Sequence, residues 1–448
     1  MFSRILIANR GEIALRIIRA CKELGVETVA VFSEVDRNAS YLHLADERIC
    51  IGAAPSAESY LNIPRIIAAA EIADVEAIHP GYGFLAENAH FAEICRDCKI
   101  EFVGPSVESM RALGDKIQAK ELAKAANVPV VPGSDGLVET EEDAVRVANE
   151  IGYPVAVKAA AGGGGRGIRF AHNEVTLRSN FNQAQSEAEI AFKDGRLYME
   201  KCIQNFRHIE VQILGDRTGN VVHLYERECS VQRRQQKVIE ETPAPELPAE
   251  LRDAICDAAV RLAREVGYHN AGTVEFMLDA DGNFYFLEVN TRIQVEHCIT
   301  EMATDVDLVK WQLHVASGRK LAMTQDDIHH SGASIECRIN AEDPDNDFRP
   351  CPGRVEALVL PGGPGIRWDS HIHQGYVIPP TYDSMIGKLI AYGPTRSEAI
   401  ATALRALDEF VIGPTKTTAA LCRRVLAHRR FARGQWDTGF IEREMLGK

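Results

Sequence analysis

The chain has 448 residues, of which 46% are hydrophobic and 25% charged, and this composition is typical of a globular protein with about three domains. Its formal net charge of −14 argues against general nucleic-acid binding, but it leaves room for local sites that bind anionic substrates. The N-terminus lacks the apolar core of a signal peptide and no apolar run is long enough to span a membrane, so we expect a cytoplasmic protein that does not bind membranes.

The N-terminal part of the chain alternates between strands and helices. Its predicted strands cover residues 4–8, 28–32, 77–79 and 101–103, and its predicted helices cover 64–72 and 12–24, the latter ended by Gly25. Strand–helix–strand order predicts a parallel, Rossmann-like sheet, but the lack of a G-x-G-x-x-G motif argues against dinucleotide binding. The loop His79–Phe84 follows a strand end, where such folds bind ligands, and a packed Gly/Pro turn is an equally good interpretation.

The eleven cysteines are odd in number and scattered along the chain, which favours reduced thiols over a disulfide framework. Cys95 and Cys98 form a C-x-x-C pair, and no second pair stands at the spacing of a zinc ribbon. We therefore expect both side chains at core positions of one helical turn.

A glycine-rich segment follows a predicted strand in the middle of the chain. The strand 155–158 ends at Lys158, residues 160–167 read AAGGGGRG, and a strand resumes at 168–170. Backbone N–H groups that approach closely, beside a cation, suit phosphate oxygens, although this is not a Walker A loop. Ordering consecutive glycines costs backbone entropy, so we favour a lid that closes on a ligand over a flexible hairpin turn.

The segment Thr273–Thr300 predicts a β-hairpin followed by polar residues. Apolar and polar residues alternate on both sides of a turn at Asp281–Asn283, so Glu288 and Asn290 project from one face, and Glu275 joins them if the strand register allows it. Carboxylate and amide oxygens on one face suit Mg²⁺ that is shared with substrate phosphates. A solvated sheet edge is the alternative, but unlike polar groups follow at once and favour a functional site. They are Arg292, Gln294, Glu296 and His297.

Four further segments carry polar residues or mark a boundary. Leu197–Lys201 ends in two charges and is suited to hinge a lid and present Glu200 to a base or ribose. In the strand that follows, His208, Glu210 and Gln212 share one face. Gln232–Lys237 is a basic cluster that we expect in a solvated loop, with an anion-binding role for one or two of its side chains. The polar segment 324–332 predicts a joint between domains, before the strand Ala333–Asn340.

Motifs along the whole chain resemble those of the biotin carboxylase family, the ATP-grasp component of biotin-dependent carboxylases. In order, the matching motifs are IANRGEIALRI (7–17), HPGYGFLAEN (79–88), GDK (114–116), the glycine-rich segment, MEK (199–201), QRRQQK (232–237), EVNTRIQVEH (288–297) and ECRINAEDP (336–344). The last two are specific to this family among ATP-grasp enzymes, and the acetyl-CoA carboxylase subunit is the member that the chain resembles most.

The resemblance implies an α/β and α+β fold of three domains. They are a Rossmann-like N-terminal domain (1–113), an ATP-grasp domain (114–325) with a mobile glycine-rich lid at about 131–203, and a mixed β C-terminal domain (331–440). It also implies a homodimer. Because no Met-Lys-Met acceptor motif occurs in the chain, we expect the biotin carboxyl carrier protein and the carboxyltransferase to be separate polypeptides.

The resemblance further implies a reaction. ATP, with Mg²⁺ or Mn²⁺, phosphorylates bicarbonate to carboxyphosphate, which breaks down to CO₂ and phosphate. Biotin on the carrier protein loses its N1′ proton to that phosphate and takes up the CO₂. This is the first half-reaction of acetyl-CoA carboxylase in fatty acid synthesis.

The matching positions imply a role for each site residue. The implied ATP contacts are Lys116, Lys158, Gly164, Gly165, Glu200, Lys201 and His208. The implied metal ligands are Glu275 and Glu288, with Asn290 beside them. The implied bicarbonate site consists of Lys237, Arg292, Gln294, Val295 and Glu296, with Glu296 as general base. Arg338 matches the residue that stabilises the biotin enolate, and Tyr82 matches a biotin contact.

The charges of these residues suit the implied chemistry. Lys237 and Arg292 lower the cost of gathering bicarbonate beside a phosphate. We expect Arg292 to depress the pKa of Glu296 and so to hold it as a carboxylate. Arg338 keeps its charge at any working pH, and its planar fork suits an enolate oxygen.

Three positions depart from the family pattern. Gln235 stands where His is usual, Cys298 where Pro is usual, and Ala161 where Gly is common. Gln235 removes a proton carrier and alters a nucleotide-side residue, and Cys298 relaxes a backbone constraint just after Glu296. We expect activity to survive these changes.

Two rival functions are weighed against this one. Another ATP-grasp ligase, with an acyl-phosphate intermediate and an amine acceptor, is disfavoured by Arg338 and the bicarbonate residues. A non-catalytic nucleotide-binding subunit would lack some catalytic residues, and all are present: Glu275, Glu288, Arg292 and Glu296. Because the transferase chooses the final acceptor, a subunit of a split pyruvate or other acyl-CoA carboxylase is the alternative assignment.

Overall fold

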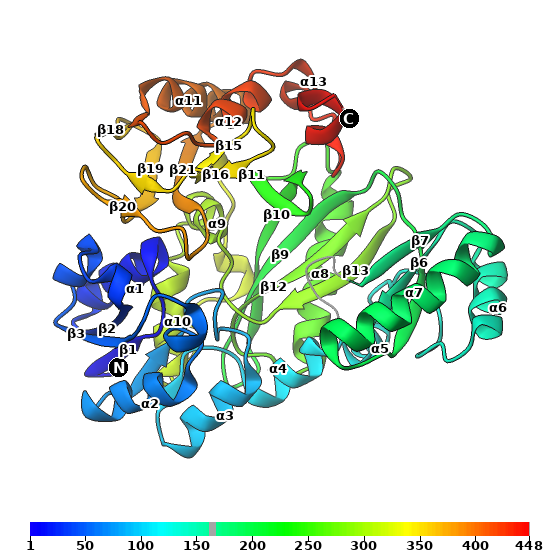
Figure 1. Ribbon diagram of the computed structural model, residues 1–448, viewed down its shortest axis with the longest axis horizontal. Coiled ribbons are helices and arrows are strands. Elements are labelled where there is room, and N and C mark those ends of the chain that lie inside the picture. Colours follow the sequence, from blue (N-terminus) through cyan, green and yellow to red (C-terminus); the bar gives the residue numbers. More distant parts are fainter. Residues whose placement is uncertain (161–166, 448) are drawn as a thin grey trace.

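The computed structural model describes residues 1–160 and 167–447. Figure 1 shows a long central sheet in the middle of the molecule, a parallel-sheet unit at lower left, a small unit at right and a group of helices at the top. Residues 161–166, which include Ala161, Gly164 and Gly165, lie outside the described residues.

The N-terminal unit is a parallel sheet with five described strands. In spatial order they are β3 (Glu47–Gly52), β2 (Glu27–Ser33), β1 (Arg4–Ile7), β4 (Ala77–His79) and β5 (Glu101–Phe102). The helices of this unit are α1 (Gly11–Leu24), α2 (Ile63–Ile72) and α3 (Ala89–Asp97). Gly25 ends α1 in the left-handed conformation at a φ of 71°, which glycine adopts without steric cost. The predicted parallel sheet is therefore confirmed.

The central sheet has eight described strands, and all neighbours in it are antiparallel. In spatial order they are β13 (Phe284–Asn290), β12 (Asn270–Leu278), β9 (Arg207–Gly215), β10 (Val221–Arg233), β11 (Gln236–Thr242), β14 (Ala333–Asn340), β21 (Met385–Gly393) and β19 (Ile366–Ser370). Because β11 pairs with β14, the sheet runs on past the polar segment 324–332, in which the sequence predicted a joint. One sheet therefore carries residues from both sides of that segment.

The two faces of the central sheet differ in chemistry. One face packs its apolar side chains, among them those of β9, against α8 (Ala249–Glu265) and α5 (Lys116–Ala125). The other face carries Glu210 and Gln212, which share one face as predicted and have no exposed surface. The helix α9 (His297–Thr304) packs over β10, β11 and β14 on that side and contributes to the burial.

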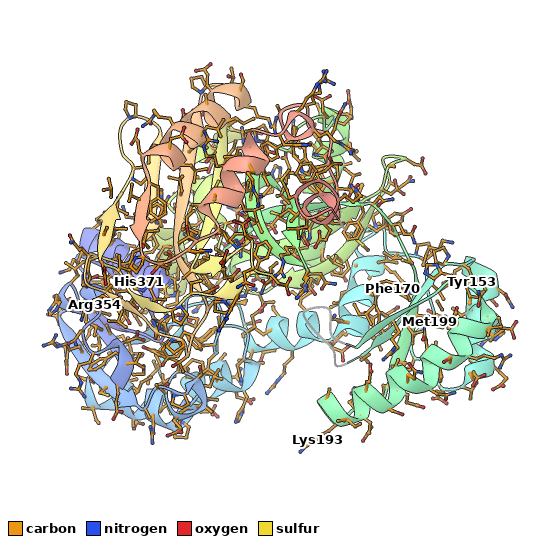
Figure 2. All side chains as sticks on the ribbon, turned by 45° about the horizontal axis from the view of Figure 1, so that its top comes forward. Tyr153, Phe170, Lys193, Met199, Arg354 and His371 are labelled. Carbon is orange, nitrogen blue, oxygen red and sulfur yellow. The ribbon has the colours of Figure 1, made fainter. Side chains whose placement is uncertain are left out.

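A smaller unit stands beside the central sheet. Its described strands are β7 (Ile168–Ala171), β6 (Val155–Ala159) and β8 (Leu197–Lys201), and α6 (Glu141–Ile151) and α7 (Glu174–Phe192) pack on them. Figure 2 shows Tyr153, Phe170, Met199 and Lys193 on this unit, on the opposite side of the molecule from Arg354 and His371. The strands predicted around the glycine-rich segment are thus confirmed, and they pair with β8 in one small sheet.

The remaining elements complete the top and the connections of the molecule. The helices are α4 (Val107–Gly114), α10 (Leu308–Ala316), α11 (Arg396–Glu409), α12 (Ala419–Leu426) and α13 (Arg429–Ala432). The short strand pairs are β15 (Glu342–Asp343) with β16 (Arg349–Pro350), β17 (Gly353–Arg354) with β20 (Val377–Ile378), and β18 (Ala357–Val359) with β22 (Val411–Gly413). Across the described residues, no helix combines the length and the apolar character that a membrane crossing requires.

Two local predictions are wrong in part. Cys95 is a core residue of α3, but Cys98 follows the end of that helix and is exposed. The basic cluster is a solvated loop only at its turn, because its other residues form the ends of β10 and β11. In that turn Arg234 and Gln235 have φ angles of 47° and 66°, and both side chains are exposed. The hairpin register, rather than the charge run, therefore determines where these side chains lie.

Candidate active site

Glu275 and Glu288 stand opposite each other on β12 and β13, so the strand register does allow Glu275 to join Glu288. A β-bulge follows, since the next pair along the hairpin skips Leu287. The bulge allows Phe286 and Val289 both to enter the apolar core under the sheet, which strict alternation does not permit. The bulge at Leu287 thus lets Glu288 face the polar side while Phe286 and Val289 face the core.

Glu275 lies at the centre of the polar face. Its carboxylate accepts hydrogen bonds from Lys237 Nζ (3.0 Å), Asn290 Nδ2 (2.9 Å) and Gln294 Nε2 (3.0 Å), and His208 Nε2 lies 3.1 Å away. Burial raises the pKa of Glu275, but Lys237 and His208 outweigh that effect and hold the pKa well below its ordinary value. Glu275 is therefore a carboxylate at neutral pH.

Glu288 is in the opposite electrostatic situation. Burial and the facing Glu275 raise the pKa of Glu288, and Lys116 only partly offsets them. Among the described residues, no side chain or backbone group donates a hydrogen bond to its carboxylate. Two adjacent carboxylates, one of them without a protein donor, form a ligand set that fits a hard divalent cation such as Mg²⁺. Asn290 fits less well, because its Oδ1 already accepts a hydrogen bond from Arg292 at 2.9 Å.

Lys237 joins three carboxylates on the polar face. Its Nζ lies 2.6 Å from Glu210, 3.0 Å from Glu275 and 2.7 Å from Glu296. Burial lowers the pKa of Lys237, but these carboxylates raise it well above its ordinary value. The charged ammonium group of Lys237 therefore bridges the carboxylates of Glu275 and Glu296 on the polar face.

Glu296 has no exposed surface and lies between two cations. Its Oε1 accepts from Lys237 Nζ at 2.7 Å, and its Oε2 accepts from Arg338 Nη2 at 3.0 Å. Burial raises the pKa of Glu296, but Lys237, then Arg338, hold it well below its ordinary value. The sequence predicted this effect for Arg292, whereas the main contribution comes from the two cations that contact the carboxylate directly.

Arg338 connects Glu296 to a second buried carboxyl group. Its Nε donates to Glu240 Oε1 at 2.5 Å, from the neighbouring strand β11. Burial raises the pKa of Glu240 to about 7, and Arg338 partly opposes that rise. The guanidinium group thus lies between two acidic side chains and contacts both of them directly.

Arg292 is held by the loop that carries it and by the N-terminal unit. It donates to Asn290 Oδ1 at 2.9 Å and to Gln294 Oε1 at 3.1 Å, and its Nε lies 3.1 Å from the carboxylate of Glu87. Glu87 also accepts from the backbone of Thr291 at 3.2 Å. Glu87 belongs to the motif at 79–88, but nothing in its local pattern marks it as a site residue.

The predicted nucleotide contacts come together only in part. Glu200 Oε1 accepts from Lys120 at 2.7 Å, and its other oxygen accepts from Lys158. Lys201 projects from the opposite face of β8, where its Nζ donates to the carbonyls of Gly152 and Tyr153, each at 2.9 Å. Its side chain is therefore not part of the Glu200 cluster. Lys120 was missed, because a lysine one helical turn after Lys116 reads as a solvated residue.

Tyr82 and Val295 enter the site from different units. Tyr82, in the loop after β4, donates its hydroxyl hydrogen to Glu12 on α1. The backbone carbonyl of Val295 accepts a hydrogen bond from Lys388 at 2.8 Å. The carbonyl that Lys388 contacts thus belongs to the residue directly before Glu296.

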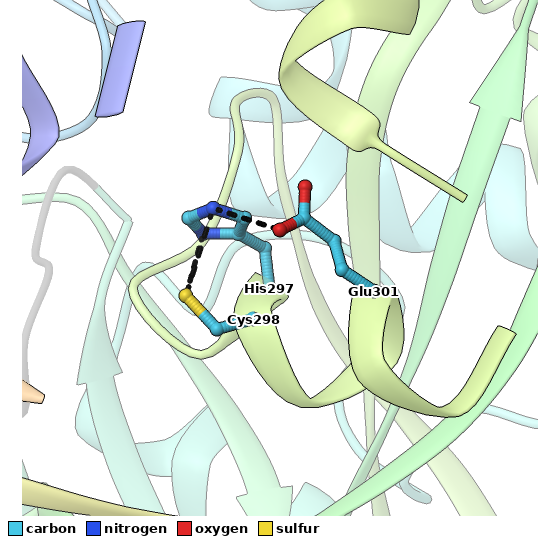
Figure 3. Close-up of side chains that lie close together, drawn as sticks. All are labelled: His297, Cys298 and Glu301. Atoms are coloured by element: carbon cyan, nitrogen blue, oxygen red, sulfur yellow. Dashed lines mark hydrogen bonds and ion pairs between the residues drawn. The ribbon is translucent and has the colours of Figure 1, made fainter. Parts of the chain in front are cut away.

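The cluster shown in Figure 3 is a packing network behind the site. His297, Cys298 and Glu301 lie close together on α9, and His297 Nδ1 donates to the carbonyl of Gln294 at 2.7 Å. Although the residue types suit a metal, Glu301 already accepts from Arg16 at 2.8 Å and from Arg367 at 2.7 Å. These two guanidinium groups neutralise Glu301, so the cluster anchors α9.

Family models match almost all of the chain. The biotin carboxylase N-terminal domain matches residues 1–110, the carbamoyl-phosphate synthase L chain ATP-binding domain matches 115–324, and the biotin carboxylase C-terminal domain matches 336–443. A biotin carboxylase of Nostoc sp. is 55% identical over 98% of this chain and 99% of that protein. A pyruvate carboxylase subunit of Methanothermobacter thermautotrophicus is 52% identical over 100% of this chain and 91% of that protein.

Solved structures with the same fold belong to similar enzymes. The Campylobacter jejuni biotin carboxylase, described as a β,γ-ATP complex, has a TM-score of 0.96, 50% identity and 99% coverage of both chains. The biotin carboxylase domain dimer of Hydrogenobacter thermophilus 2-oxoglutarate carboxylase has a TM-score of 0.95 and 50% identity, and covers 99% of this chain and 98% of its own. That domain was solved with MgADP and bicarbonate. The fold and the site thus define an ATP-grasp ligase. The chain belongs to the biotin carboxylase family, as its motifs predicted.

Proposed function

We propose that this protein uses ATP and bicarbonate to carboxylate biotin on a biotin carboxyl carrier protein, and that it serves acetyl-CoA carboxylase in fatty acid synthesis. The observation that carries the chemistry is the fully buried Glu296, which lies between Lys237 and Arg338. Since its pKa is depressed, Glu296 is a carboxylate at neutral pH and can accept a proton from bicarbonate. The adjacent Glu275–Glu288 pair supports the use of a nucleotide beside it.

In the first step, Glu296 takes the proton of bicarbonate while the freed oxygen attacks the γ-phosphorus of ATP. The bond from that phosphorus to the bridging oxygen breaks, so the products are carboxyphosphate and ADP. Lys237 and Arg292 balance the negative charge of the two anions as they approach. Gln294 and the Val295 backbone are the remaining proposed bicarbonate contacts.

In the second step, carboxyphosphate breaks into CO₂ and phosphate, and the phosphate accepts the N1′ proton of biotin. The ureido anion then forms a carbon–nitrogen bond with CO₂. Arg338 balances the charge that develops on the ureido oxygen, because a guanidinium group remains charged at the working pH. Tyr82 is the proposed contact on the biotin ring.

We propose that Glu275 and Glu288 hold Mg²⁺ or Mn²⁺, with Asn290 beside them. The cation supplies charge neutralisation to the phosphoryl group in transfer. The proposed nucleotide contacts are Lys116, Lys158, Gly164, Gly165, Glu200, Lys201 and His208. MgADP and bicarbonate in the related 2-oxoglutarate carboxylase domain support this assignment.

The assembly is proposed on similar grounds. We propose three domains at 1–113, 114–325 and 331–440, with a lid at about 131–203 whose strands form their own small sheet. The dimer named in the related structure supports a homodimer. A carboxyltransferase is a further proposed partner. The eleven cysteines are free thiols, which supports a cytoplasmic location.

The activity is tested by ADP release from the purified protein with ATP, Mg²⁺, bicarbonate and free biotin. We expect ADP release to require bicarbonate, to rise with biotin, and to accompany transfer of labelled bicarbonate carbon to biotin. Glu296→Gln should abolish the bicarbonate-dependent rate, whereas Asp281→Asn, in the exposed turn between β12 and β13, should retain it. A rate of ATP hydrolysis that does not depend on bicarbonate would refute the proposal.

The final acceptor is tested separately. The related 2-oxoglutarate carboxylase domain and the pyruvate carboxylase relative favour a second candidate, in which the chain serves a carboxylase with another acceptor. The biotinylated protein and the transferase that co-purify with the chain should be assayed with acetyl-CoA, pyruvate and 2-oxoglutarate. Malonyl-CoA as the product supports the first assignment, and oxaloacetate or a carboxylated 2-oxoglutarate supports the second.

A further inference from the structure

Lys388 is a lysine with no exposed surface, on strand β21, and the chemistry above does not use it. Its Nζ donates to the carbonyl oxygen of Val295 at 2.8 Å and lies 3.2 Å from Glu12 Oε1. It also lies 6.0 Å from the centre of the Tyr82 ring. Removing an ammonium group from water is costly unless its partners compensate it, so these contacts hold the amine at a defined place.

The first contact acts on the backbone that carries Glu296. The Val295 carbonyl and the Glu296 N–H belong to one peptide group, which is planar because of its partial double bond. An amine bound to that carbonyl therefore fixes the orientation of the peptide plane between Val295 and Glu296. Helix α9 starts one residue later, at His297, so the peptide stands at the junction between a loop and a helix.

The second contact acts on the biotin side. Glu12 Oε1 is the acceptor for both Lys388 Nζ and the hydroxyl of Tyr82. The lysine thus sets the place of the carboxylate that in turn orients the Tyr82 side chain. The three residues come from β21, α1 and the loop after β4, which are far apart in the sequence and meet at this amine.

We propose that Lys388 is a positioning residue that orients the Val295–Glu296 peptide for bicarbonate and, through Glu12, the Tyr82 ring for biotin. This inference rests on the proposed function. One buried amine thereby aligns both bicarbonate and biotin, the two substrates that must meet. A purely structural ion pair would support folding in the same way but would not favour one substrate over another.

The test is Lys388→Met, which keeps most of the side-chain volume and removes the donor. Loss of a hydrogen bond from a charged donor should raise the KM for bicarbonate in the ATPase assay at least about tenfold. The KM for free biotin should rise as well, and kcat should fall because Glu296 is no longer aligned. The KM for ATP should stay unchanged, since Lys388 contacts none of the proposed nucleotide residues.

A matched control is Arg396→Met. Arg396 on α11 donates to the buried carboxylate of Glu241 at 2.6 Å and to the carbonyl of Phe431 at 2.9 Å, away from the bicarbonate loop. This variant should lower the melting temperature and leave the KM values for bicarbonate and biotin unchanged. The control distinguishes the general effect of losing a buried cation from the specific effect of losing Lys388.

Two further variants separate the arms of the proposal. Glu12→Gln keeps the bond from Lys388 to Val295, so it should raise the KM for biotin and leave that for bicarbonate unchanged. The double variant Lys388→Met/Glu12→Gln removes both charges together. If Lys388→Met alone does not fold, the double variant should fold and still show the raised KM for bicarbonate.

Opposite results would overturn the proposal. A folded Lys388 variant with unchanged KM for bicarbonate refutes it, and so does an equal rise in the KM for ATP. If the unsubstituted protein itself shows no bicarbonate-dependent ATPase, the proposed function fails. An active unsubstituted protein with an insensitive Lys388→Met variant refutes the positioning role alone.

Discussion

Glu275 on β12 is the direct cross-strand partner of Glu288 on β13, yet only Glu275 accepts hydrogen bonds from neighbouring side chains in the described structure. Two carboxylates at this spacing repel each other, and the shift of the Glu288 pKa to a higher value expresses that repulsion. The pair is therefore arranged to gain stability when a cation binds.

Glu288→Gln should raise the Mg²⁺ concentration needed for half-maximal activity and lower kcat by about a hundredfold or more, because the cation offsets phosphoryl charge in the transition state. The measurement is the ATPase rate over a Mg²⁺ titration. Asp281→Asn, in the exposed turn of the same hairpin, is the control and should behave as the unsubstituted protein does. Turnover at the normal rate in Glu288→Gln would contradict the ligand assignment.

Lys237→Met should lower the free energy of unfolding by about 3–5 kcal/mol, because it leaves three buried carboxylates without their common cation. It should also abolish bicarbonate-dependent ATPase activity. Urea denaturation and the ATPase assay measure the two effects. Arg252→Met, which breaks the 2.8 Å pair with the buried Glu226 on the other side of the sheet, should destabilise the protein but preserve the KM for bicarbonate. Retained bicarbonate dependence in Lys237→Met would remove this lysine from the proposed site.

Three enclosed histidines should each contribute a loss of stability as the pH drops below 6.5. Burial lowers the pKa of each of three enclosed histidines to about 3, from an ordinary value of 6.5. They are His79, His297 and His371. Between these pH values only the unfolded chain binds the proton, so each residue costs about 1.4 kcal/mol of stability per pH unit below 6.5.

Urea denaturation at pH 7.5 and at pH 5.5 measures this loss. His371→Asn should remove one histidine's contribution to the change of the free energy of unfolding with pH. The exposed His90→Gln should leave that change as it is in the unsubstituted protein. If His371→Asn and the unsubstituted protein changed by the same amount over this pH range, His371 would not be held neutral in the folded protein.

Cys298 should be unreactive in the folded protein although it stands next to the site. It has no exposed surface, its Sγ donates to Asp369 Oδ2 at 3.1 Å, and burial raises the pKa of its thiol well above the ordinary value. Iodoacetamide should label the exposed Cys50 in the native state and Cys298 only after unfolding, as peptide mass spectrometry would report. Equal labelling rates would contradict this.

The same contact predicts the effect of a conservative change. Cys298→Ser should keep the hydrogen bond to Asp369, so the free energy of unfolding should change by no more than about 1 kcal/mol and activity should persist. A loss of bicarbonate-dependent ATPase activity would show that the sulfur itself matters.

Much of the architecture follows from local sequence pattern. The helix that Gly25 ends, the parallel pairing in the N-terminal unit and the hairpin from Thr273 were all predictable, because the period of apolar residues and the turn chemistry act over a few neighbouring positions. The strand β3 and its place at the edge of that sheet were not predicted. The same pattern placed Glu275, Glu288 and Asn290 on one face. The basic cluster was misread, because its charges suggested solvent while β11 pairs on both sides within the sheet.

The sequence by itself determined the family, the principal secondary-structure elements and the residue types available for chemistry. Only the tertiary structure decided which of them meet: Lys237 rather than Arg292 contacts Glu296, Glu87 contacts Arg292, and Lys388 reaches the carbonyl of Val295 from a strand far along the chain. Such contacts depend on strand register and on the pairing of charges removed from water, and both are set by residues that are distant in the sequence.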